Sequence, residues 1–182
     1  MKKFELTSEF ITNIFGTKLF RIKALIEFGN VKAGELGGFV EKEENLSQDG
    51  NAWVYDNARV YGDACVCGDA WVYDNARVCG DARVHGNARV YGDACVYGDA
   101  RVCGDACVYG DAGYATVHGF GSEYRTTTFF KTKAGVGVKC GCFYGNLSEF
   151  RKKVVETHGE TKKAKEYLML ADLMEFRFSD NS

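Results

Sequence analysis

Histidine and cysteine side chains are the groups in this 182-residue sequence that could act as a base, a nucleophile or a metal ligand. His85 lies inside a regular repeat and His118 just after it, and either could take a proton from a reacting group. Cys67, His85 and Cys103 are evenly spaced, one in every third unit of a six-residue repeat. If three units make one coil, the outer cysteines stand roughly 9–10 Å apart, whereas the ligands of one zinc ion lie within about 4 Å of each other. We therefore expect surface thiols beside a histidine rather than a zinc site.

The other cysteines give no stronger metal signal. Cys140 and Cys142 form a C-x-C sequence with no second pair to complete a metal site, so a metal ion there is an alternative that the spacing does not favour. The chain has 8 cysteines but no export signal, because its start, MKKFELTSEF, lacks an apolar segment. We expect free thiols in a reducing cytoplasm, and no bound cofactor.

Composition excludes several classes of protein. A net charge of −2 argues against a strongly basic nucleic-acid binder, so we expect no direct nucleic-acid partner. No apolar run approaches the ~18 residues of a membrane span, so no membrane partner is expected either. The charge is uneven, because residues 50–112 hold 5 Arg and 9 Asp but no Lys or Glu. That middle segment is where repeats should be sought.

The middle of the chain is built from six-residue units such as Asn-Ala-Arg-Val-Tyr-Gly. Alanine recurs once in every unit from Ala52 to Ala112, and valine from Val54 to Val108. This period fits the 3.6-residue repeat of a helix poorly, but an alanine and a valine two apart face one side of a strand. The Gly-Asp, Gly-Asn or Asp-Asn pair that follows predicts a turn. Stacked units can share a core that one unit cannot form alone.

A longer period, of three units, indicates how the units stack. Trp53 and Trp71 hold the same place in units that are three apart, and three units make one turn of a triangular coil. The sequence therefore predicts a mainly β fold, a three-sided parallel β-helix with roughly four coils spaced by about 4.8 Å. Face one would carry Trp53, Tyr55, Trp71, Tyr73, Arg89, Tyr91, Cys107 and Tyr109. Face two would carry Arg59, Tyr61, Arg77, Cys79, Cys95 and Tyr97, and face three Cys65, Cys67, Arg83, His85, Arg101 and Cys103.

This pattern resembles the hexapeptide-repeat superfamily of left-handed β-helices, which includes trimeric acyltransferases. Val54 with Ala58 matches the aliphatic and small positions of that repeat, whereas Tyr, Cys or His directly after the valine departs from it. The resemblance implies a left-handed coil. It also implies an acyl-CoA donor, a groove between subunits and a histidine base, here His85 or His118. The flanks at 34–40 and 138–143 resemble phage and prophage proteins of Gram-positive bacteria, which implies a bacterial host cell.

Face one has the residue types that dominate protein-binding hot spots. Its rings could stack between coils beneath a terminal element, form a contact between copies of the chain, or bind a foreign protein. The candidate partner-binding residues are Trp53, Tyr55, Trp71, Tyr73, Arg89, Tyr91 and Tyr109.

One corner of the coil is acidic. Asp63, Asp81 and Asp99 share a column, where like charges at coil spacing repel, and neighbouring arginines could relieve that repulsion. We expect solvated turns here, with cation binding and mimicry of a nucleic-acid backbone as alternatives.

Smaller elements flank the repeats. We expect an N-terminal α/β cap with an irregular first coil over residues 1–49, the β-helix over 50–121, and a C-terminal cap over 122–182. In the first segment, residues 8–15 read as a short helix and 18–26 as a strand.

The C-terminal cap is predicted to contain a hairpin followed by two helices. The hairpin strands are expected at 124–131 and 135–143. Asn146 and Glu149 form a capping box for a helix that stops at Gly159. A second helix is expected over residues 161–175 and a closing strand over 176–178.

The leading functional interpretation is a non-catalytic protein-binding scaffold, phage-like by resemblance, that inhibits a host defence factor. We favour a non-catalytic role because the repeats contain no loop insertion that could shape a substrate pocket. The alternative is a trimeric acyltransferase using acyl-CoA with a histidine base. In both cases self-association is expected, with a trimer as one form of the homo-oligomer. A structural protein stacking end to end is a third hypothesis, which the capped ends disfavour.

Overall fold

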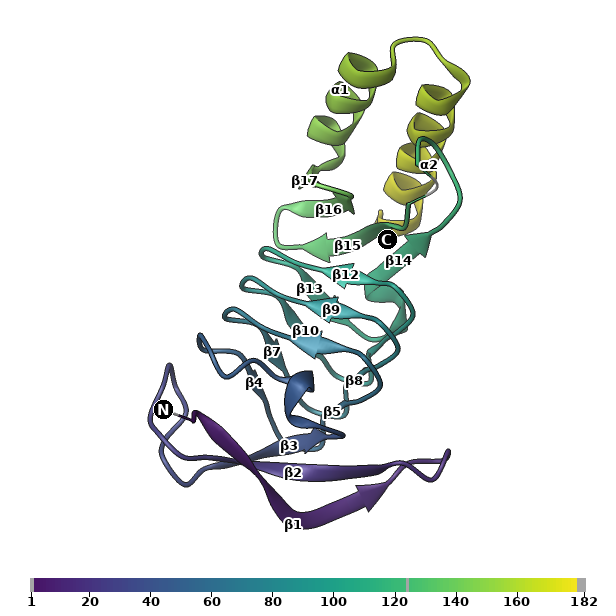
Figure 1. Cartoon of the computed structure of the whole chain (residues 1–182). Coiled ribbons are helices and arrows are strands. Elements are labelled where there is room, and N and C mark those ends of the chain that lie inside the picture. Colours follow the sequence, from purple (N-terminus) through teal and green to yellow (C-terminus); the bar gives the residue numbers. More distant parts are fainter. Residues whose placement is uncertain (1, 124, 180–182) are drawn as a thin grey trace.

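The structure is a computed structural model that describes residues 2–123 and 125–179. Short strands stack as parallel coils in the middle, with a β-sheet at the N-terminal end and a sheet with two helices at the C-terminal end (Figure 1). This arrangement confirms the predicted mainly β fold with a three-sided parallel β-helix. Within the described residues, no helix is long and apolar enough to cross a membrane.

The three faces have the predicted membership. Face one contains β4 (Trp53–Val54), β7 (Trp71–Val72), β10 (Arg89–Tyr91) and β13 (Cys107–Tyr109). Face two contains β5 (Arg59–Val60), β8 (Arg77–Val78) and β11 (Cys95–Val96). Face three contains β6 (Cys65–Val66), β9 (Arg83–Val84) and β12 (Arg101–Val102). Each strand pairs in parallel with its counterpart in the next coil, as Val54 with Val72 shows.

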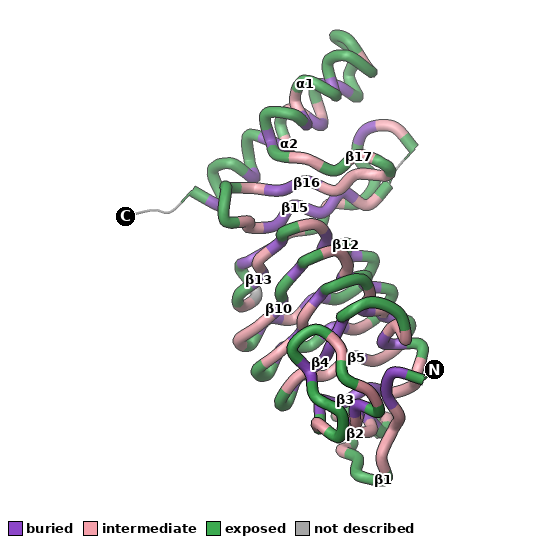
Figure 2. The backbone as a smooth tube through the Cα atoms, turned by 90° about the vertical axis from the view of Figure 1, so that its left-hand side faces the viewer, coloured by how far each residue is buried: buried purple, intermediate pink, exposed green. Residues whose placement is uncertain are grey.

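The core is a narrow column of alanine and valine side chains. The repeat alanines from Ala52 to Ala106 and the valines from Val54 to Val108 are at most 1% exposed. Figure 2 shows buried segments recurring along each coil of the backbone. The corner at Gly86 needs glycine, because its φ is 72° and a Cβ there would lie 2.8 Å from the backbone nitrogen of Gly104 in the next coil.

The N-terminal cap is a β cap rather than the expected α/β one. Strands β1 (Phe4–Thr12), β2 (Lys18–Ala24) and β3 (Leu36–Val40) form an antiparallel sheet, and β3 continues face two by pairing in parallel with β5. The strand expected at 18–26 is confirmed. The helix expected at 8–15 is wrong, because these residues finish β1, where Phe10 pairs with Phe20, and enter a turn. Within residues 2–49 the helical element is a single 3-10 turn, η1 (Glu43–Asn45).

The cap also supplies hydrogen-bond donors to backbone carbonyl groups at the exposed edge of the first coil. The Asn45 amide donates to the carbonyls of Gly62 and Ala64 at 3.0 and 2.8 Å. The Lys3 ammonium donates to the carbonyls of Gly50 and Ala52 at 3.3 and 3.0 Å. Leu46 bridges to Val66, which is farther along the chain than the regular offset of three units, so the first coil is irregular as predicted.

The C-terminal cap is a four-stranded antiparallel sheet covered by two helices. A second 3-10 turn, η2 (Asp111–Gly113), leads into it. Its strands are β14 (Tyr114–Val117), β15 (Thr127–Thr132), β16 (Gly135–Cys140) and β17 (Phe143–Asn146), and its helices are α1 (Leu147–His158) and α2 (Lys162–Phe178). The hairpin is confirmed as β15 and β16, although residue 124, where we expected it to start, lies outside the described residues. The two outer strands were not predicted.

Helix α1 begins and ends as predicted. The Asn146 side chain accepts from the Glu149 amide at 2.9 Å, and the Glu149 carboxylate accepts from the Asn146 amide at 2.9 Å. The strand expected at 176–178 is wrong, because α2 continues to Phe178. That ring completes a buried helical stripe with Ala171 and Met174, which the sheet and α1 cover.

The cap seals the end of the β-helix. Phe130 on β15 is fully buried in the core of the coils, whereas the adjacent Phe129 belongs to the separate core of the cap. Further contacts tie the two parts together, since the Tyr114 hydroxyl donates to the Cys95 carbonyl at 2.9 Å and the Arg101 amide donates to the Thr128 hydroxyl at 3.0 Å. Both ends of the column are therefore closed by the chain itself.

Candidate functional site

Face one carries a ladder of aromatic rings that stack between coils. The ring centroids of Tyr73 and Tyr91 lie 5.0 Å apart with planes within 3° of parallel, and those of Tyr91 and Tyr109 lie 5.1 Å apart. The Arg89 guanidinium lies over the Trp71 ring, 4.8 Å from its centroid. The pairing register produces these contacts, because it sets each residue beside its counterpart in the next coil. We call Trp71, Tyr73, Arg89, Tyr91 and Tyr109 the aromatic ladder.

Two of the predicted partner-binding residues lie outside this ladder. Trp53 is fully buried between Phe4 and Phe28 of the N-terminal cap, at centroid distances of 6.2 and 5.3 Å. It therefore cannot touch a partner, and its assignment as an exposed binding residue is wrong. Tyr55 is half-buried and packs edge-on against Trp71. The terminal element that we weighed as a cover for face one thus covers its first coil.

The ladder ends at hollows beside the C-terminal cap. One cavity of about 480 Å³ is lined in part by Arg89, Cys107, Lys133 and Tyr144. A second, of about 290 Å³, adjoins Tyr91, Cys107, Tyr109, Lys131 and Lys133. The cap residues were not in the predicted set, because they lie well beyond the repeats in the sequence. The excess of lysine and arginine after residue 112 was the only signal for them.

The hollow beside Arg89 contains charged side chains of both signs, Arg89 and Lys133 with Asp105 and Glu149. Its two carboxylates already have donors, since Asp105 accepts from the Asn87 amide at 3.1 Å and Glu149 belongs to the α1 capping box. Among the described residues, neither Arg89 nor Lys133 forms an ion pair. Arg89 and Lys133 can therefore still bind an acidic group of a ligand, next to the two carboxylates of the same hollow.

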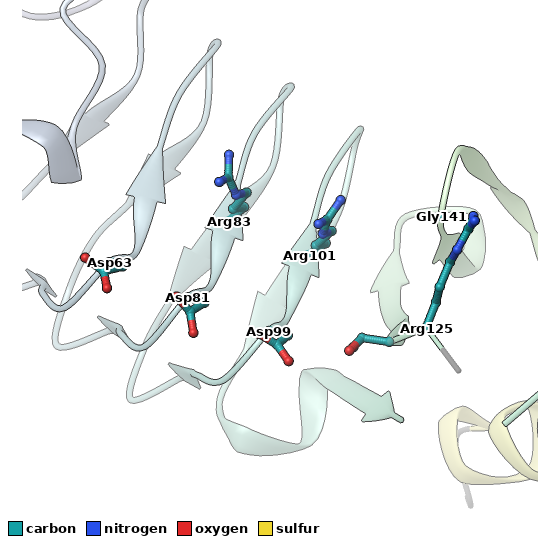
Figure 3. Close-up of a pocket in the computed structure, with 8 residues that line it drawn as sticks. Asp63, Asp81, Arg83, Asp99, Arg101, Arg125 and Gly141 are labelled. Atoms are coloured by element: carbon teal, nitrogen blue, oxygen red, sulfur yellow. The ribbon is translucent and has the colours of Figure 1, made fainter. Parts of the chain in front are cut away.

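A third hollow follows face three. It has a volume of about 630 Å³ and is lined by Asp63, Asp81, Arg83, Asp99, Arg101, Arg125, Thr126 and Gly141. Figure 3 shows the aspartates in one row, with Arg83 and Arg101 beside them and pointing away. The Lys42 ammonium pairs with Asp63 at 2.8 Å, and this hydrogen bond lowers the pKa of that carboxyl. Within the described residues Arg83 and Arg101 form no direct ion pair with these aspartates.

His85 lies in a cationic environment on face three. Its imidazole is about half-buried, and burial together with the charges of Lys139, Arg101 and Arg83 lowers its pKa below 6.5. The ring is therefore neutral at pH 7 and can accept a proton. No hydrogen bond joins the His85 ring to a carboxylate in the described part of the chain, so no acidic group orients it.

His118 occupies a different element from His85. It follows β14, it is exposed, and its Nδ1 lies 3.1 Å from the Thr126 hydroxyl. His85 and His118 thus remain separate candidates, and the structure gives neither a carboxylate partner among the described residues.

The cysteines have the character of structural thiols. Cys103 is buried, and burial raises its pKa to about 11. Burial also raises the pKa of Cys67, so both thiols stay protonated at neutral pH. Cys140 accepts from the Thr127 hydroxyl at 3.2 Å, whereas Cys142 is exposed. No group of three potential metal ligands occurs among the residues that the structure describes.

Stacked parallel coils with this repeat define a β-solenoid protein. Residues 52–68, 70–86, 82–98 and 88–104 match a family model described as the YdcK Beta solenoid repeat. A protein of Escherichia coli (strain K12), the "Uncharacterized acetyltransferase YdcK", is 40% identical over 70 residues, which cover 34% of this chain and 22% of that protein. These similarities support a relationship of the repeats to the repeat β-helix superfamily. The chain spans about a fifth of the length of this relative.

Proposed function

We propose that this chain is a non-catalytic protein-binding scaffold whose contact surface is the aromatic ladder. The observation that carries the proposal is the exposure of Tyr109, which is 67% exposed, and of Arg89 on the neighbouring strand of the same face. Tyrosine, tryptophan and arginine supply most of the energy in protein interfaces. Because the rings already stack on one another, a partner would order few additional side chains on binding.

We expect a carboxylate group of the partner to bind beside Arg89 and Lys133, although Asp105 and Glu149 line the same hollow. Arg89 and Lys133 lack carboxylate partners among the described residues, and they line the hollow at the end of the ladder. A partner that inserts a carboxylate there would form charge-assisted hydrogen bonds.

The experiment compares two exposed tyrosines on different faces. Chains carrying Arg89→Ala with Tyr109→Ala are used to capture proteins from a bacterial lysate, and the bound proteins are quantified by mass spectrometry. The matched control is Tyr97→Ala, because Tyr97 is 61% exposed but lies on face two. We expect the double variant to lose specific partners by about 30-fold or more, the loss that corresponds to a hot spot, and the control to retain them. Equal retention by both variants would overturn the assignment of the ladder.

The resemblance of the flanks to phage proteins extends this proposal to the kind of partner. It favours a host protein in the bacterial cytoplasm, and inhibition of a host defence factor as the role. Expression of the chain in a phage-resistant host should then raise the plating efficiency of the phage, and the ladder variant should not. Unchanged plating with either chain would argue against this role.

Acyl transfer is the second candidate function. It is favoured by the similarity to a protein named as an acetyltransferase and by a half-buried, neutral His85 flanked by Arg83, Arg101 and Lys139. Those cations would attract the phosphates of an acyl-CoA donor, and His85 would take the proton of the acceptor. Acetyl transfer from acetyl-CoA should be lost in His85→Gln. Transfer that survives replacement of both His85 and His118 would exclude a histidine mechanism.

A further inference from the structure

The C-terminal cap contains a hollow of its own, between the end of β16, the start of β17 and the two helices. Its volume is about 210 Å³, and none of its lining residues belongs to the repeats or to the aromatic ladder. We call it the cap pocket. The lining residues on which the inference rests are Arg125, Phe143, Phe150, Lys153, His158 and Tyr167.

Aromatic rings form the walls of the cap pocket. The ring centroids of Phe143 and Phe150 lie 5.5 Å apart, and those of Phe150 and Tyr167 lie 5.7 Å apart. The His158 ring stacks on Tyr167 with a centroid distance of 5.8 Å. Phe150 and Tyr167 are 3% and 4% exposed, so the packing of the cap holds these walls in place. Fixed rings lose little freedom when another ring packs on them, which favours a planar apolar ligand.

The size of the cap pocket limits that ligand to a small molecule. A volume of about 210 Å³ corresponds to about seven water molecules at roughly 30 Å³ each. A single ring with a short side chain fits such a space, whereas a nucleotide or a folded peptide segment does not.

The charged side chains that line the cap pocket are cationic. Arg125 and Lys153 are both exposed, and among the described residues no aspartate or glutamate lines this hollow. The Lys153 ammonium lies 3.6 Å from the Glu156 carboxylate, but an exposed pair of this kind contributes little and leaves the ammonium able to bind a ligand. Arg125 also lines the hollow of face three, yet it forms no ion pair with a carboxylate of the described residues.

The backbone of the cap makes room for the Arg125 side chain. A Cβ at Gly141 would lie 2.5 Å from Nη1 of Arg125, so glycine allows the guanidinium to lie against the turn between β16 and β17. Figure 3 shows the guanidinium end of Arg125 next to Gly141. On the helical side, the Tyr167 hydroxyl donates to the Ser122 carbonyl at 3.2 Å. A cation and an aromatic wall therefore meet in one hollow.

We propose that the cap pocket binds a small aromatic carboxylate. The ring of the ligand packs against Phe150 and Tyr167, and its carboxylate binds at Arg125 and Lys153. Aromatic walls alone would also suit a quaternary ammonium ion, but two cations without a lining carboxylate repel such a ligand. A guanidinium can hold a carboxylate through two parallel hydrogen bonds, which gives the anion its orientation.

This inference does not depend on the proposed function, because the cap pocket and the aromatic ladder share no residue. A chain that binds its protein partner through the ladder can bind a small carboxylate in the cap, and either property can fail without the other.

The first experiment titrates the full chain with phenylacetate and follows the methyl resonances of Val154, which lines the cap pocket, by NMR. We expect saturable shifts with a dissociation constant of about 1 mM or lower, as is usual for a ligand of this size. Phenylacetamide has the same shape without the charge, phenethylamine has the opposite charge, and acetate lacks the ring. Each of these three compounds should bind at least about 10-fold more weakly.

The second experiment tests the cations. The variant Arg125→Gln with Lys153→Gln should bind phenylacetate about 10-fold more weakly, because two exposed charged contacts are lost. Its melting temperature should match that of the parent, since both side chains lie outside the core. The matched control is Lys152→Gln, because Lys152 is an exposed lysine of the same helix that does not line the cap pocket, and its affinity should be unchanged.

The third experiment locates the ligand by thiol protection. Cys142 is exposed and lines the cap pocket, so bound phenylacetate should slow its alkylation by iodoacetamide. Cys79 on face two lies outside this hollow and serves as the internal reference within the same digest. Phenylacetamide at the same concentration should leave both rates unchanged.

Several outcomes would overturn the proposal. Phenylacetate that causes no saturable shift would exclude the pocket as a binding site for this class of ligand. Equal affinity for phenylacetamide or phenethylamine, or for the double variant, would exclude recognition of the carboxylate by Arg125 and Lys153. Alkylation of Cys142 that phenylacetate does not slow relative to Cys79 would place the ligand elsewhere. None of these results would affect capture of a partner by the ladder.

Discussion

The most quantitative test of the N-terminal cap concerns Lys3, which is 2% exposed. Its ammonium donates to the carbonyls of Gly50 and Ala52 and lies 4.9 Å from the centroid of the Phe28 ring. Burial lowers the pKa of Lys3 from 10.5 to about 8, against the opposing effect of Asp49 and Asp69. The same cap buries Trp53, so a test of Lys3 also tests which part of face one is exposed to a binding partner.

The sign of the pH dependence follows from this lowered pKa. Between pH 8 and 10.5 the unfolded chain holds a proton on Lys3 that the folded chain has lost, so the contribution of Lys3 to stability rises with pH. One unit of pKa shift corresponds to about 1.4 kcal/mol, so the total change over this window is about 3 kcal/mol. Below pH 8 that penalty is fully present, because the buried ammonium is charged.

The assay is urea unfolding of the parent and of Lys3→Met at pH 7, 8, 9 and 10 under reducing conditions. The free energy of unfolding of the parent minus that of the variant should increase across this range. Titration of tyrosines and cysteines is common to both chains and cancels in the difference. Loss of the donors to Gly50 and Ala52 adds a pH-independent offset of about 1–3 kcal/mol. A difference that is flat or falls with pH would show that Lys3 is not buried in this way.

Three further predictions test other parts of the molecule. Gly98→Ala and Gly104→Ala should each lower stability by about 1–2 kcal/mol, because φ is 63° and 64° there. Gly104→Ala should cost measurably more in thermal melts, since its Cβ would overlap the Tyr144 hydroxyl; equal melting temperatures would contradict the contact with the cap. Asn45→Ala should lower the free energy of unfolding by about 1–3 kcal/mol in urea, because two carbonyls lose their donor, and a neutral effect would count against this cap. In an NMR titration His85 should show a pKa below 6.5, and a value at or above 6.5 would refute its cationic surroundings.

The errors of sequence reasoning share one physical cause. Residues 8–15 were assigned to a helix, yet the first part of this segment belongs to β1, which pairs with β2 on both sides of a register shift between Leu6 and Phe10. Residues 176–178 were assigned to a strand because Phe176 and Phe178 alternate with an arginine. In α2 these two rings point to opposite sides, one into the cap core and one outward. The secondary structure of such short segments depends on the elements that pack against them.

The same cause limited the candidate site. Spacing placed Trp71, Tyr73, Arg89, Tyr91 and Tyr109 on one face, and the structure confirms that placement. Spacing carried no information on whether a cap residue lies over a given coil, so it could not separate the buried Trp53 from the exposed members. Spacing also could not predict that lysines of the C-terminal cap lie at the end of the ladder.

The repeat by itself determined the architecture, because in stacked coils the sequence period is the pairing register. A constant offset of three units set Val54 beside Val72 and Arg89 beside Trp71 before any distant segment was considered. The tertiary structure alone decided which surfaces remain exposed. The N-terminal sheet removes Trp53 from the exposed part of face one, and Phe130 closes the opposite end of the column. On α2, Phe178 is buried in the cap whereas Phe176 stays exposed. Exposure depends on contacts between segments far apart in the chain, and those contacts leave no period in the sequence.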